Sequence, residues 1–594
     1  MPYASHLHKH SKIHSVCAKL PADEDIRVHG MICNFDAVAM AKTTDICTNG
    51  EKYVSLQAYI YLQMQKLQNI LILCVVVFAV QVRAQVHITI TDPETWTVSE
   101  LSGYVGQTVV FDQPMYVCNN YYSDLTIAPR RIFSPTNQAI PRSTEYKSIL
   151  SLNSSGTMSL SGVSGYHRMG EKIYNLTVRV NSQSSLTYKS GSFRGNTRAD
   201  IEAGLPDVGD YRLLVCAANL EYYLVDNWGR GYGPDSYSQH QKQRTKVRQA
   251  LAKIGADIYG LVEIEQGQSA LKEIAADLTE DTGYEYTYID DGGSSNGSYT
   301  KSGYVYRTDK VRPDGRLYSN NERVMNRKKI QAFQEIETGE VFFFSLNHFK
   351  AKSGSGSGSD ADQGDGQGTF NYSRTMEAKS VINQYNRIRP QFHESDLLVM
   401  GDLNAYAKED PITIFATAGM IDLHRAFHGD TSYSYTYHGQ AGYLDHAICN
   451  TTLCPQITGM AAYHINSDES DEYTYDKSND QTMFRYSDHD PVLVGLALDS
   501  TLAAASTDPI VNNFGIVDND GTQMLIFSDY ITIYNAYHAN DKSYYAIYTA
   551  HGWLVEQGDI DSTPYTLPVP ATSGVYIVYV YSGGQTYQRK IIVP

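Results

Sequence analysis

The stretch from Val399 to Pro411, VMGDLNAYAKEDP, places two polar side chains, Asp402 and Asn404, directly after the apolar run Leu397–Met400. That run has the length and composition of a buried β-strand. Taken alone, an Asp-x-Asn pattern after a strand is more typical of a turn or a helix cap than of a ligand set. Whether these two side chains serve a site therefore depends on what other strands bring to the same sheet edge.

Strands and helices alternate along the chain around this stretch. A strand is predicted at Leu213–Asn219, an amphipathic helix at Lys242–Ile254 that ends at Gly255, and a second strand at Asp257–Ile264. The same alternation continues as far as residue 499. It predicts one α/β domain over residues 206–499.

Polar residues follow several of the predicted strands or lie in the loops and short motifs beside them, where a site at a sheet edge is expected. Besides Asp402 and Asn404 they are Asn219, Glu221, Glu263, Asn347, His348, Asp445, His446, Asp488, His489 and Asp490. Carboxylate and amide oxygens are hard ligands for Mg²⁺, Mn²⁺ or Ca²⁺, and two histidines in separate segments suit acid and base roles on a phosphate ester. A zinc site is disfavoured because the chain has neither a Cys-rich spacing nor an HExxH helix.

Three motifs, in chain order, resemble the endonuclease/exonuclease/phosphatase family, whose members include pancreatic-type deoxyribonuclease: Gly401-Asp-Leu-Asn404, Tyr443-Leu-Asp-His-Ala447 and Ser487-Asp-His-Asp-Pro-Val492. A closer similarity to the secreted bacterial nuclease branch rests on Asn347-His-Phe-Lys-Ala-Lys-Ser353, Asp362-Gln-Gly-Asp-Gly-Gln-Gly368 and Arg374. The resemblance covers residues 208–498. It implies a four-layer α/β/β/α sandwich with the site at one edge.

The resemblance also implies a role for each catalytic residue. His489 is expected to act as the general base and Asp445 to orient it, while His348 binds or protonates a phosphate oxygen. Asp402 and Asn404 are expected to hold the phosphate and the nucleophilic water. The reaction implied is in-line attack of water on a phosphodiester, with a metal ion neutralising the developing charge.

By the same resemblance, the metal side of the site consists of Glu263, Asp488 and Asn219, with Mg²⁺ or Mn²⁺ as the expected ion and Ca²⁺ as a further candidate. Lys350 and Arg374 are expected to supply a local positive rim. The chain departs from the pattern in two places. Ser298-Tyr-Thr300 stands where deoxyribonuclease-like members have a carboxylate that supports the first histidine, and Thr369 stands where many secreted relatives have a cysteine.

The glycine-rich loop of residues 353–368 carries three acidic residues, Asp360, Asp362 and Asp365. Their spacing does not match an EF-hand, so the loop is interpreted either as a structural Ca²⁺ site or as a loop that flanks the substrate. Cys449 and Cys454 are close enough in the chain for a small-loop disulfide, with two free thiols as the alternative. Cys216 lies in an apolar strand pattern and is expected to be a buried thiol.

The sequence on either side of the α/β domain indicates additional, separate segments. Residues 64–84 have the features of a signal peptide cleaved after Ala84, which makes residues 1–63 an upstream extension. Residues 85–205 predict an all-β module, for which the resemblance suggests an oligonucleotide-binding barrel. Residues 500–594 predict a linker and a β-sandwich whose end resembles the C-terminal sorting domain of type IX secretion cargo, with an ordinary small β-sandwich as the alternative.

These patterns predict a secreted or cell-surface, metal-dependent nuclease that acts on DNA, with RNA as the alternative, and that the type IX machinery exports. No membrane span is expected in the mature chain. The formal net charge of −17 argues against a broad basic surface, so contacts with nucleic acid should be local. The rival interpretations are the same fold acting on another phosphodiester or monoester, as a sphingomyelinase or phosphatase, and a non-catalytic surface binding protein.

Overall fold

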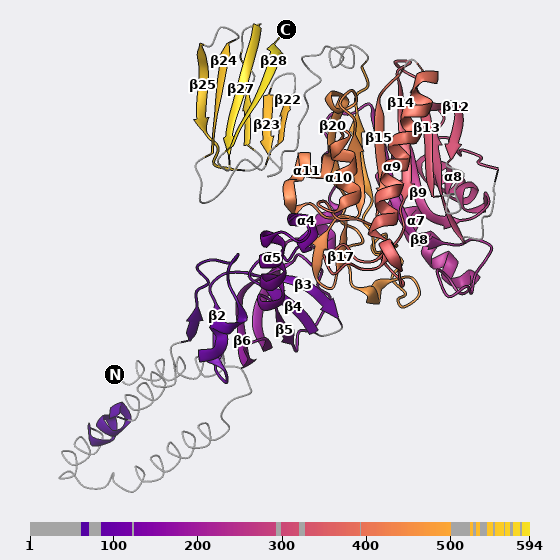
Figure 1. Cartoon of the computed structure of the whole chain (residues 1–594). Helices are drawn as coiled ribbons and strands as arrows, with labels where there is room; N and C mark the ends of the chain where they lie inside the picture. Colours follow the sequence, from indigo (N-terminus) through magenta and orange to yellow (C-terminus); the bar gives the residue numbers. More distant parts are fainter. Residues whose placement is uncertain are drawn as a thin grey trace, which may run out of the picture. The chain divides into compact units, whose positions relative to one another are not determined.

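The computed structural model describes residues 61–69, 85–121, 124–292, 299–319, 327–392 and 394–499, together with the strands and adjoining residues of 523–593 (Figure 1). The chain divides into two compact units, Met1–Gln85 and Val86–Pro594. Of the first unit the structure describes a helical segment at residues 61–69, so the rest of the expected extension and signal peptide lies outside the described residues. Among the described helices none is long and apolar enough to cross a membrane.

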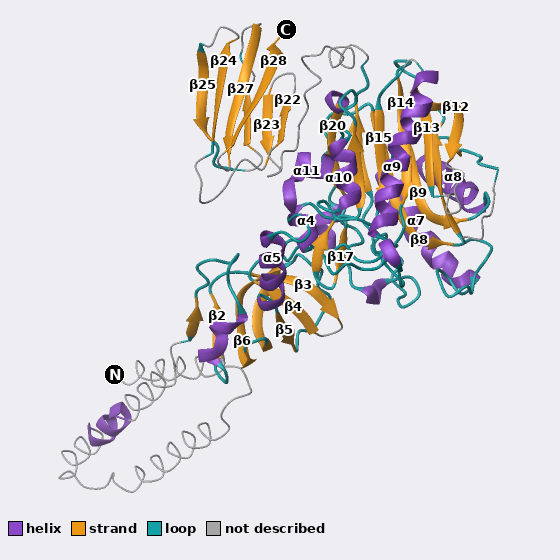
Figure 2. Ribbon diagram, in the orientation of Figure 1, coloured by secondary structure: helices purple, strands orange, loops and turns teal. Residues whose placement is uncertain are grey.

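Two six-stranded sheets form the centre of the α/β domain (Figure 2). The first has the order β10 (Tyr286–Tyr288), β11 (Thr300–Arg307), β9 (Ile258–Glu265), β8 (Leu213–Tyr223), β21 (Val492–Leu496) and β20 (Ile457–Ala462). The second has the order β12 (Val311–Ser319), β13 (Lys328–Glu335), β14 (Val341–His348), β15 (Leu397–Asp402), β19 (Asp445–Cys449) and β16 (Ile421–Asp422). The α/β class expected from the sequence is therefore confirmed.

The two sheets pack face to face because their strands are apolar on both sides. In β8, Leu213, Val215 and Ala217 join the core between the sheets, whereas the alternate residues Leu214 and Cys216 join the core under the helices. Gly260 of β9 permits the close approach, since a Cβ there would lie 2.6 Å from the Cζ atom of Phe344 in the opposite sheet. This rigid centre fixes the strand ends that carry the polar residues.

Helices cover the outer face of each sheet. Helices α7 (Tyr237–Ile254) and α8 (Ser269–Thr282) pack on the first sheet through Val247, Leu251 and Ile274 among others. Helices α9 (Asn371–Ile388) and α10 (Asp410–Thr417) pack on the second sheet. The result is four layers, in the order α/β/β/α.

The N-terminal module is a seven-stranded sheet formed by β1 (Val86–Ile88), β2 (Thr108–Phe111), β3 (Met115–Tyr121), β4 (Asp124–Ala128), β5 (Met158–Ser161), β6 (Lys172–Ser182) and β7 (Ser185–Arg194). Five of the strands close into a ring, because β6 pairs with both β3 and β7 at the ends of the series β3-β4-β5-β7. Of these ring pairings, β5 with β7 is the parallel one. Helices α4 (Pro135–Gln138) and α5 (Thr144–Ser155) connect β4 to β5, and α6 (Arg198–Glu202) follows β7.

Buried ion pairs join this module to the α/β domain. Arg168 and Glu469 are both fully buried and lie 2.7 Å apart, and Arg198 reaches the other carboxylate oxygen of Glu469 at 2.6 Å. Nearby, Arg131 pairs with Asp468 at 2.6 Å. Each of these charges is compensated only while module and domain stay in contact, so the two parts are bound by more than a linker.

The C-terminal segment forms two antiparallel sheets. One consists of β22 (Gln523–Ile526), β23 (Tyr530–Tyr534) and β26 (Tyr565–Pro568), and the other of β25 (Leu554–Asp559), β24 (Tyr544–Thr549), β27 (Gly574–Ser582) and β28 (Gln585–Val593). Side chains of both sheets share one apolar core, which includes Ile531, Ile547 and Val578. The expected linker, residues 500–522, lies outside the described residues.

Removing Glu469 should weaken the protein strongly, because the fully buried Arg168 would lose its counter-charge, whereas Arg198 would keep its ion pair with Asp480 at 2.8 Å. We expect Glu469→Ala to lower the free energy of unfolding by about 3–5 kcal/mol, measured by urea denaturation. The matched control is Asp309→Ala, which removes a half-exposed carboxylate 2.7 Å from Arg307 and should cost less than about 1 kcal/mol. Equal effects of the two substitutions would contradict this account of the interface.

Candidate active site

Three predicted site residues lie in one row across the second sheet. His348 on β14 pairs with Asp402 on β15, and Asp402 pairs in turn with Asp445 on β19. Directly paired residues of neighbouring strands have Cβ atoms about 4.5–5.5 Å apart. Gly401 makes this row possible, because its φ is +118° and a Cβ there would lie 2.1 Å from the carbonyl oxygen of Asn347.

His489 is held against this row by Asp445. Its Nδ1 lies 2.7 Å from Asp445 Oδ2, and its Nε2 lies 3.9 Å from both Asp402 Oδ2 and Asp488 Oδ1. Burial alone would lower the pKa of His489, but the carboxylates of Asp445, Asp488 and Asp402 outweigh it and raise this pKa well above its usual value. The imidazole is thus fixed on one side and open toward Asp402 on the other.

Asp402 is surrounded by amide donors. The backbone N–H of Asn404 donates to Oδ1 at 2.8 Å, and the side-chain amides of Asn404 and Asn219 donate to Oδ2 at 3.2 and 3.3 Å. Asn404 adopts a left-handed conformation with φ +49°, which asparagine tolerates better than most residues. Burial raises the pKa of Asp402 to about 7 despite the nearby His489.

His348 faces the acidic residues with one ring nitrogen. Its Nε2 lies 3.5 Å from Glu263 Oε1 and 3.6 Å from Asp402 Oδ2. Its Nδ1 is buried and has no hydrogen-bond partner among the described residues, in line with the missing carboxylate noted at residues 298–300. Burial and the positive charges of Arg327 and His489 hold the pKa of His348 well below its usual value, which keeps the ring neutral.

Glu263 and Glu221 bring further carboxylates from the first sheet. Burial, with repulsion from Asp488 and Asp402, raises the pKa of Glu263 to about 7. Burial, with repulsion from Asp488, raises the pKa of Glu221 to about 8, and Glu221 Oε2 has no partner among the described residues. Both residues have positive φ, +57° and +48°, so the backbone is held in a strained form that turns these acids into the site.

This donor set fits a divalent cation. Asp402, Asp445 and His489 each have a potential ligand atom within 4.8 Å of the others, but Asp445 and His489 are already hydrogen-bonded to each other at 2.7 Å, which leaves Asp402 beside the acids of the first sheet. The charge of the neighbouring Glu263 adds to the rise in the pKa of Glu221, and one buried carboxylate oxygen of Glu221 has no partner among the described residues. Oxygen-rich, mutually repelling carboxylates are the environment in which Mg²⁺ or Mn²⁺ is bound. The amide oxygen of Asn219 already accepts the N–H of Glu221, so Asn219 orients the acids around it.

The two residues expected at a positive rim differ in their placement. Lys350 is half-buried beside the site, with its ammonium group 4.3 Å above the ring of Phe370. Arg374 is fully buried, and its guanidinium donates to the backbone carbonyls of Gln367, Thr369 and Lys350. Arg374 therefore does not lie on a positive rim, as the sequence predicted. Its guanidinium instead binds backbone carbonyls of the glycine-rich loop and of the residues beside it.

Sequence reasoning missed three residues that complete the site. Ser434 donates from its hydroxyl to Asp445 Oδ2 at 2.8 Å and accepts the N–H of Asp445 at 3.2 Å. The ring of Tyr435 stacks on His489 with centroids 4.6 Å apart. The positive charge of Arg327 opposes the rise in the pKa of Glu263 and helps to lower the pKa of His348. The alternating Ser and Tyr of residues 432–437 indicated a strand next to the Tyr-Leu-Asp-His motif, but nothing in the sequence assigned it a partner.

The acidic residues of the glycine-rich loop are engaged separately. Asp360 accepts hydrogen bonds from the backbone and hydroxyl of Ser373, while Asp365 pairs with Arg142 at 2.7 Å. Within the described residues, the one group of three or more potential metal ligands is that of Asp402, Asp445 and His489. The structure therefore does not bring the loop acids together as a Ca²⁺ site.

Cys449 and Cys454 are buried free thiols in the core between the sheets. Cys216 is likewise a buried thiol. Burial raises the pKa of Cys216, which makes it a poor nucleophile.

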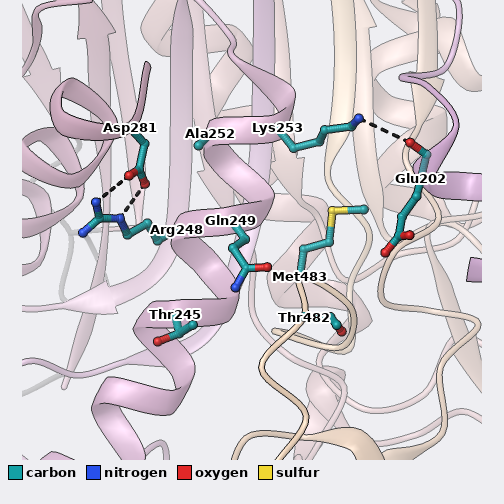
Figure 3. A pocket seen from close by; sticks show the side chains of 9 residues that line it. All are labelled: Glu202, Thr245, Arg248, Gln249, Ala252, Lys253, Asp281, Thr482 and Met483. Atoms are coloured by element: carbon teal, nitrogen blue, oxygen red, sulfur yellow. Dashed lines mark hydrogen bonds and ion pairs between the residues drawn. The ribbon is translucent and has the colours of Figure 1, made fainter. Parts of the chain in front are cut away.

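A surface pocket of about 770 Å³ opens elsewhere, along the outer side of α7 (Figure 3). Several of its charged side chains already have partners: Arg248 pairs with Asp281, and Lys253 donates to the backbone carbonyl of Glu202 at 3.3 Å. None of the residues that line it belongs to the cluster around Asp402. The pocket is therefore separate from the candidate site at the sheet edge.

Residues 228–489 match the model of the Endonuclease/Exonuclease/phosphatase family, whose members are hydrolases of phosphoester bonds. Solved structures that are similar include an endonuclease/exonuclease/phosphatase from Bacteroides vulgatus, with 18% identity, a TM-score of 0.33, and coverage of 48% of this chain and 99% of that one. A mannosyl-6-phosphatase from Bacteroides thetaiotaomicron has 18% identity, a TM-score of 0.33 and coverage of 48% and 100%. The human nocturnin catalytic domain has 12% identity, a TM-score of 0.33 and coverage of 48% and 94%. No curated protein matches the chain.

The pKa of His489 should depend on Asp445 more than on any single distant charge. We expect Asp445→Asn to lower this pKa by about 1–3, because the imidazolium loses its hydrogen-bonded counter-charge. Histidine side-chain NMR of the protein in EDTA would measure it. Asp309→Asn, in the exposed turn between β11 and β12, is the control and should leave the His489 signal in place. An unchanged pKa in Asp445→Asn would disprove the pairing.

Proposed function

We propose that the protein is a divalent-metal-dependent phosphodiesterase that hydrolyses DNA, with RNA as the alternative polymer. The observation that carries this is the arrangement of one oriented histidine, His489, and one neutral histidine, His348, on either side of Asp402. One can accept a proton from water while the other donates to a phosphate oxygen. This is the distribution of roles that in-line hydrolysis of a phosphoester requires.

Each protein group has a defined task in this reaction. His489 Nε2 takes the proton of the attacking water, and Asp445 stabilises the imidazolium through Nδ1. His348 Nε2 donates to a non-bridging oxygen or to the leaving oxygen of the phosphate. Asn404 and Asp402 hold the phosphate and the water between the two histidines. Because these groups are fixed by the sheet, little reorganisation is needed when charge develops on the phosphate.

Glu263 and Asp488, with Glu221 beside them, would hold the metal ion, for which Mg²⁺ or Mn²⁺ is the expected choice and Ca²⁺ a further candidate. When bound, the ion supplies positive charge against the phosphate oxygens. The acidic cluster alone would repel a polyanion, and the chain as a whole carries a formal charge of −17. Nucleic acid binding should therefore depend on the metal.

Aromatic rings beside the site favour a nucleic acid as substrate. Tyr222, whose N–H donates to Glu263, stacks on Tyr232 with centroids 5.1 Å apart, and Tyr232 is 54% exposed. Arg230 lies over the ring of Tyr299 at 5.7 Å and pairs with no carboxylate among the described residues. Exposed rings and an arginine next to a phosphate site suit the bases and backbone of a nucleic acid strand.

The flanking segments support a secreted nuclease. The closed five-strand ring of the N-terminal module, with its parallel β5–β7 pair, fits an oligonucleotide-binding barrel, which binds single strands. Strands β27 and β28 carry the Gly-x-Tyr-x-Val and Lys patterns and pair along their whole length. These patterns support the proposal that this end is a sorting domain for type IX secretion and that the protein, with its expected signal peptide, is secreted or held at the cell surface.

The activity itself is tested with a panel of substrates. We expect plasmid DNA to be cleaved with Mg²⁺ or Mn²⁺ and not with EDTA, and His489→Ala to lower the rate by about 10²–10⁴-fold through loss of the base. His87→Ala, in the N-terminal module, is the control and should retain activity. Release of phosphocholine from sphingomyelin, or of phosphate from a sugar phosphate, in place of DNA cleavage would favour the rival substrates. No activity on any of them would favour a binding protein.

The stacked tyrosines should affect substrate binding more than turnover. We expect Tyr232→Ala to raise KM for a single-stranded oligonucleotide by about 10- to 100-fold with kcat nearly unchanged, because one base loses its stacking partner. Tyr544→Ala is a matched control: Tyr544 is also exposed and stacks on Tyr581 with centroids 5.1 Å apart, but it lies in the C-terminal sheets. Equal KM values for Tyr232→Ala and the wild type would show that the Tyr222 and Tyr232 rings do not contact the substrate.

A further inference from the structure

Residues 430–443, called the bridging segment below, contact the catalytic pair from one side. The segment contains β17 (Tyr435–Tyr437) and β18 (Gln440–Gly442). Ser434 binds Asp445 by its hydroxyl, and its carbonyl accepts the N–H of Asp490 at 2.8 Å. Tyr435 stacks on His489 and also forms a β-bridge with it. The orientation of the general base therefore depends on where this segment lies.

The other side of the bridging segment is bound to the N-terminal module, and not to the sheets of the α/β domain alone. The N–H of Ser134 donates to the carbonyl of Ala441 at 2.8 Å, and the N–H of Ala441 donates to the carbonyl of Ile132 at 2.8 Å. These bonds form a parallel β-bridge between Phe133 and Ala441. The module thus adds a strand-like partner to the segment that holds Ser434.

Asn137 of α4 secures both arms of the bridging segment. It is fully buried, its amide nitrogen lies 3.3 Å from the carbonyl of Asp430 and 3.4 Å from that of Ser432, and its amide oxygen accepts the N–H of Tyr443 at 3.2 Å. Ser432 and Tyr443 stand two positions from Ser434 and Asp445, respectively. A single side chain of the module therefore fixes the backbone on both sides of the Ser434–Asp445 hydrogen bond.

A second set of contacts holds Tyr433, the residue next to Ser434. The guanidinium of Arg131 lies 4.9 Å from the centre of the Tyr433 ring, and the Tyr433 hydroxyl donates to Asp468 Oδ2 at 2.8 Å. Asp468 is itself paired with Arg131. These contacts come from a different element than Asn137 but converge on the same backbone.

We propose that the N-terminal module is a positioning element of the active site, in which Asn137 acts through the bridging segment and Ser434 on the Asp445–His489 pair. The inference rests on the proposed function, but it goes beyond binding of nucleic acid by the module. A displacement of about 1 Å in a catalytic group can cost on the order of 10²-fold in rate, so a hold of this kind matters for turnover even though Asn137 touches no reacting atom.

Kinetics of Asn137→Ala in the full chain test this. We expect kcat on plasmid DNA to fall by about 10- to 100-fold, with KM and the affinity for Mn²⁺ within about twofold of the wild type, because substrate and metal contacts are untouched. Ser434→Ala should give a fall of similar size. The double variant should be no slower than the slower single variant, because residues that act in series are not additive.

Tyr166→Phe is the matched control, since it removes a hydrogen bond to Glu469 at the same interface but makes no contact with the bridging segment. It should leave kcat unchanged. If Asn137→Ala does not fold, Asn137→Ser, which also cannot span both arms, replaces it. A wild-type kcat in the Asn137 variant, or effects that multiply with those of Ser434→Ala, would overturn the proposal. Wild-type protein that cleaves no DNA would instead defeat the proposed function.

Discussion

The site depends on carboxylates that are buried close together at one sheet edge. Burial of an ion costs several kcal/mol unless partners compensate it, and Asp402, Glu263 and Glu221 all have raised pKa values. Amide donors and His489 compensate Asp402, but Glu221 keeps an oxygen with no partner among the described residues. Such an arrangement is unfavourable by itself, and a bound cation would offset the repulsion between the carboxylates.

The sandwich is what makes this crowding sustainable. Asn219 and Glu263 come from the first sheet, while His348, Asp402 and Asp445 come from the second, and the apolar core between the sheets holds both sets at fixed separation. Loops alone would relax until the charges moved apart. The buried ion pairs of Arg168 and Arg131 extend the same rigidity to the N-terminal module.

The sequence was sufficient for residues that follow apolar runs in recognisable motifs. Asp402 could be expected at a sheet edge because it follows an apolar run, and Asp445 and His489 could be expected beside it because they lie in the motifs that carry the family resemblance. Arg374 could not be placed, because whether a guanidinium faces solvent or backbone carbonyls depends on the path of a glycine-rich loop. Asn137 could not be found at all, since it meets Tyr443 across 306 residues of chain and belongs to no motif. Contacts of this kind are set by packing between modules, which local patterns do not encode.

The register of β14, β15 and β19 has a consequence for how this protein can vary. Loops such as residues 353–368 can gain or lose residues without moving the strands, as loops on protein surfaces generally do. An insertion or deletion inside Leu397–Asp402 is different, because a shift of one residue turns every side chain of the strand to the opposite face. Divergence among homologous chains should therefore accumulate as gaps between these strands, while the strands themselves keep constant length.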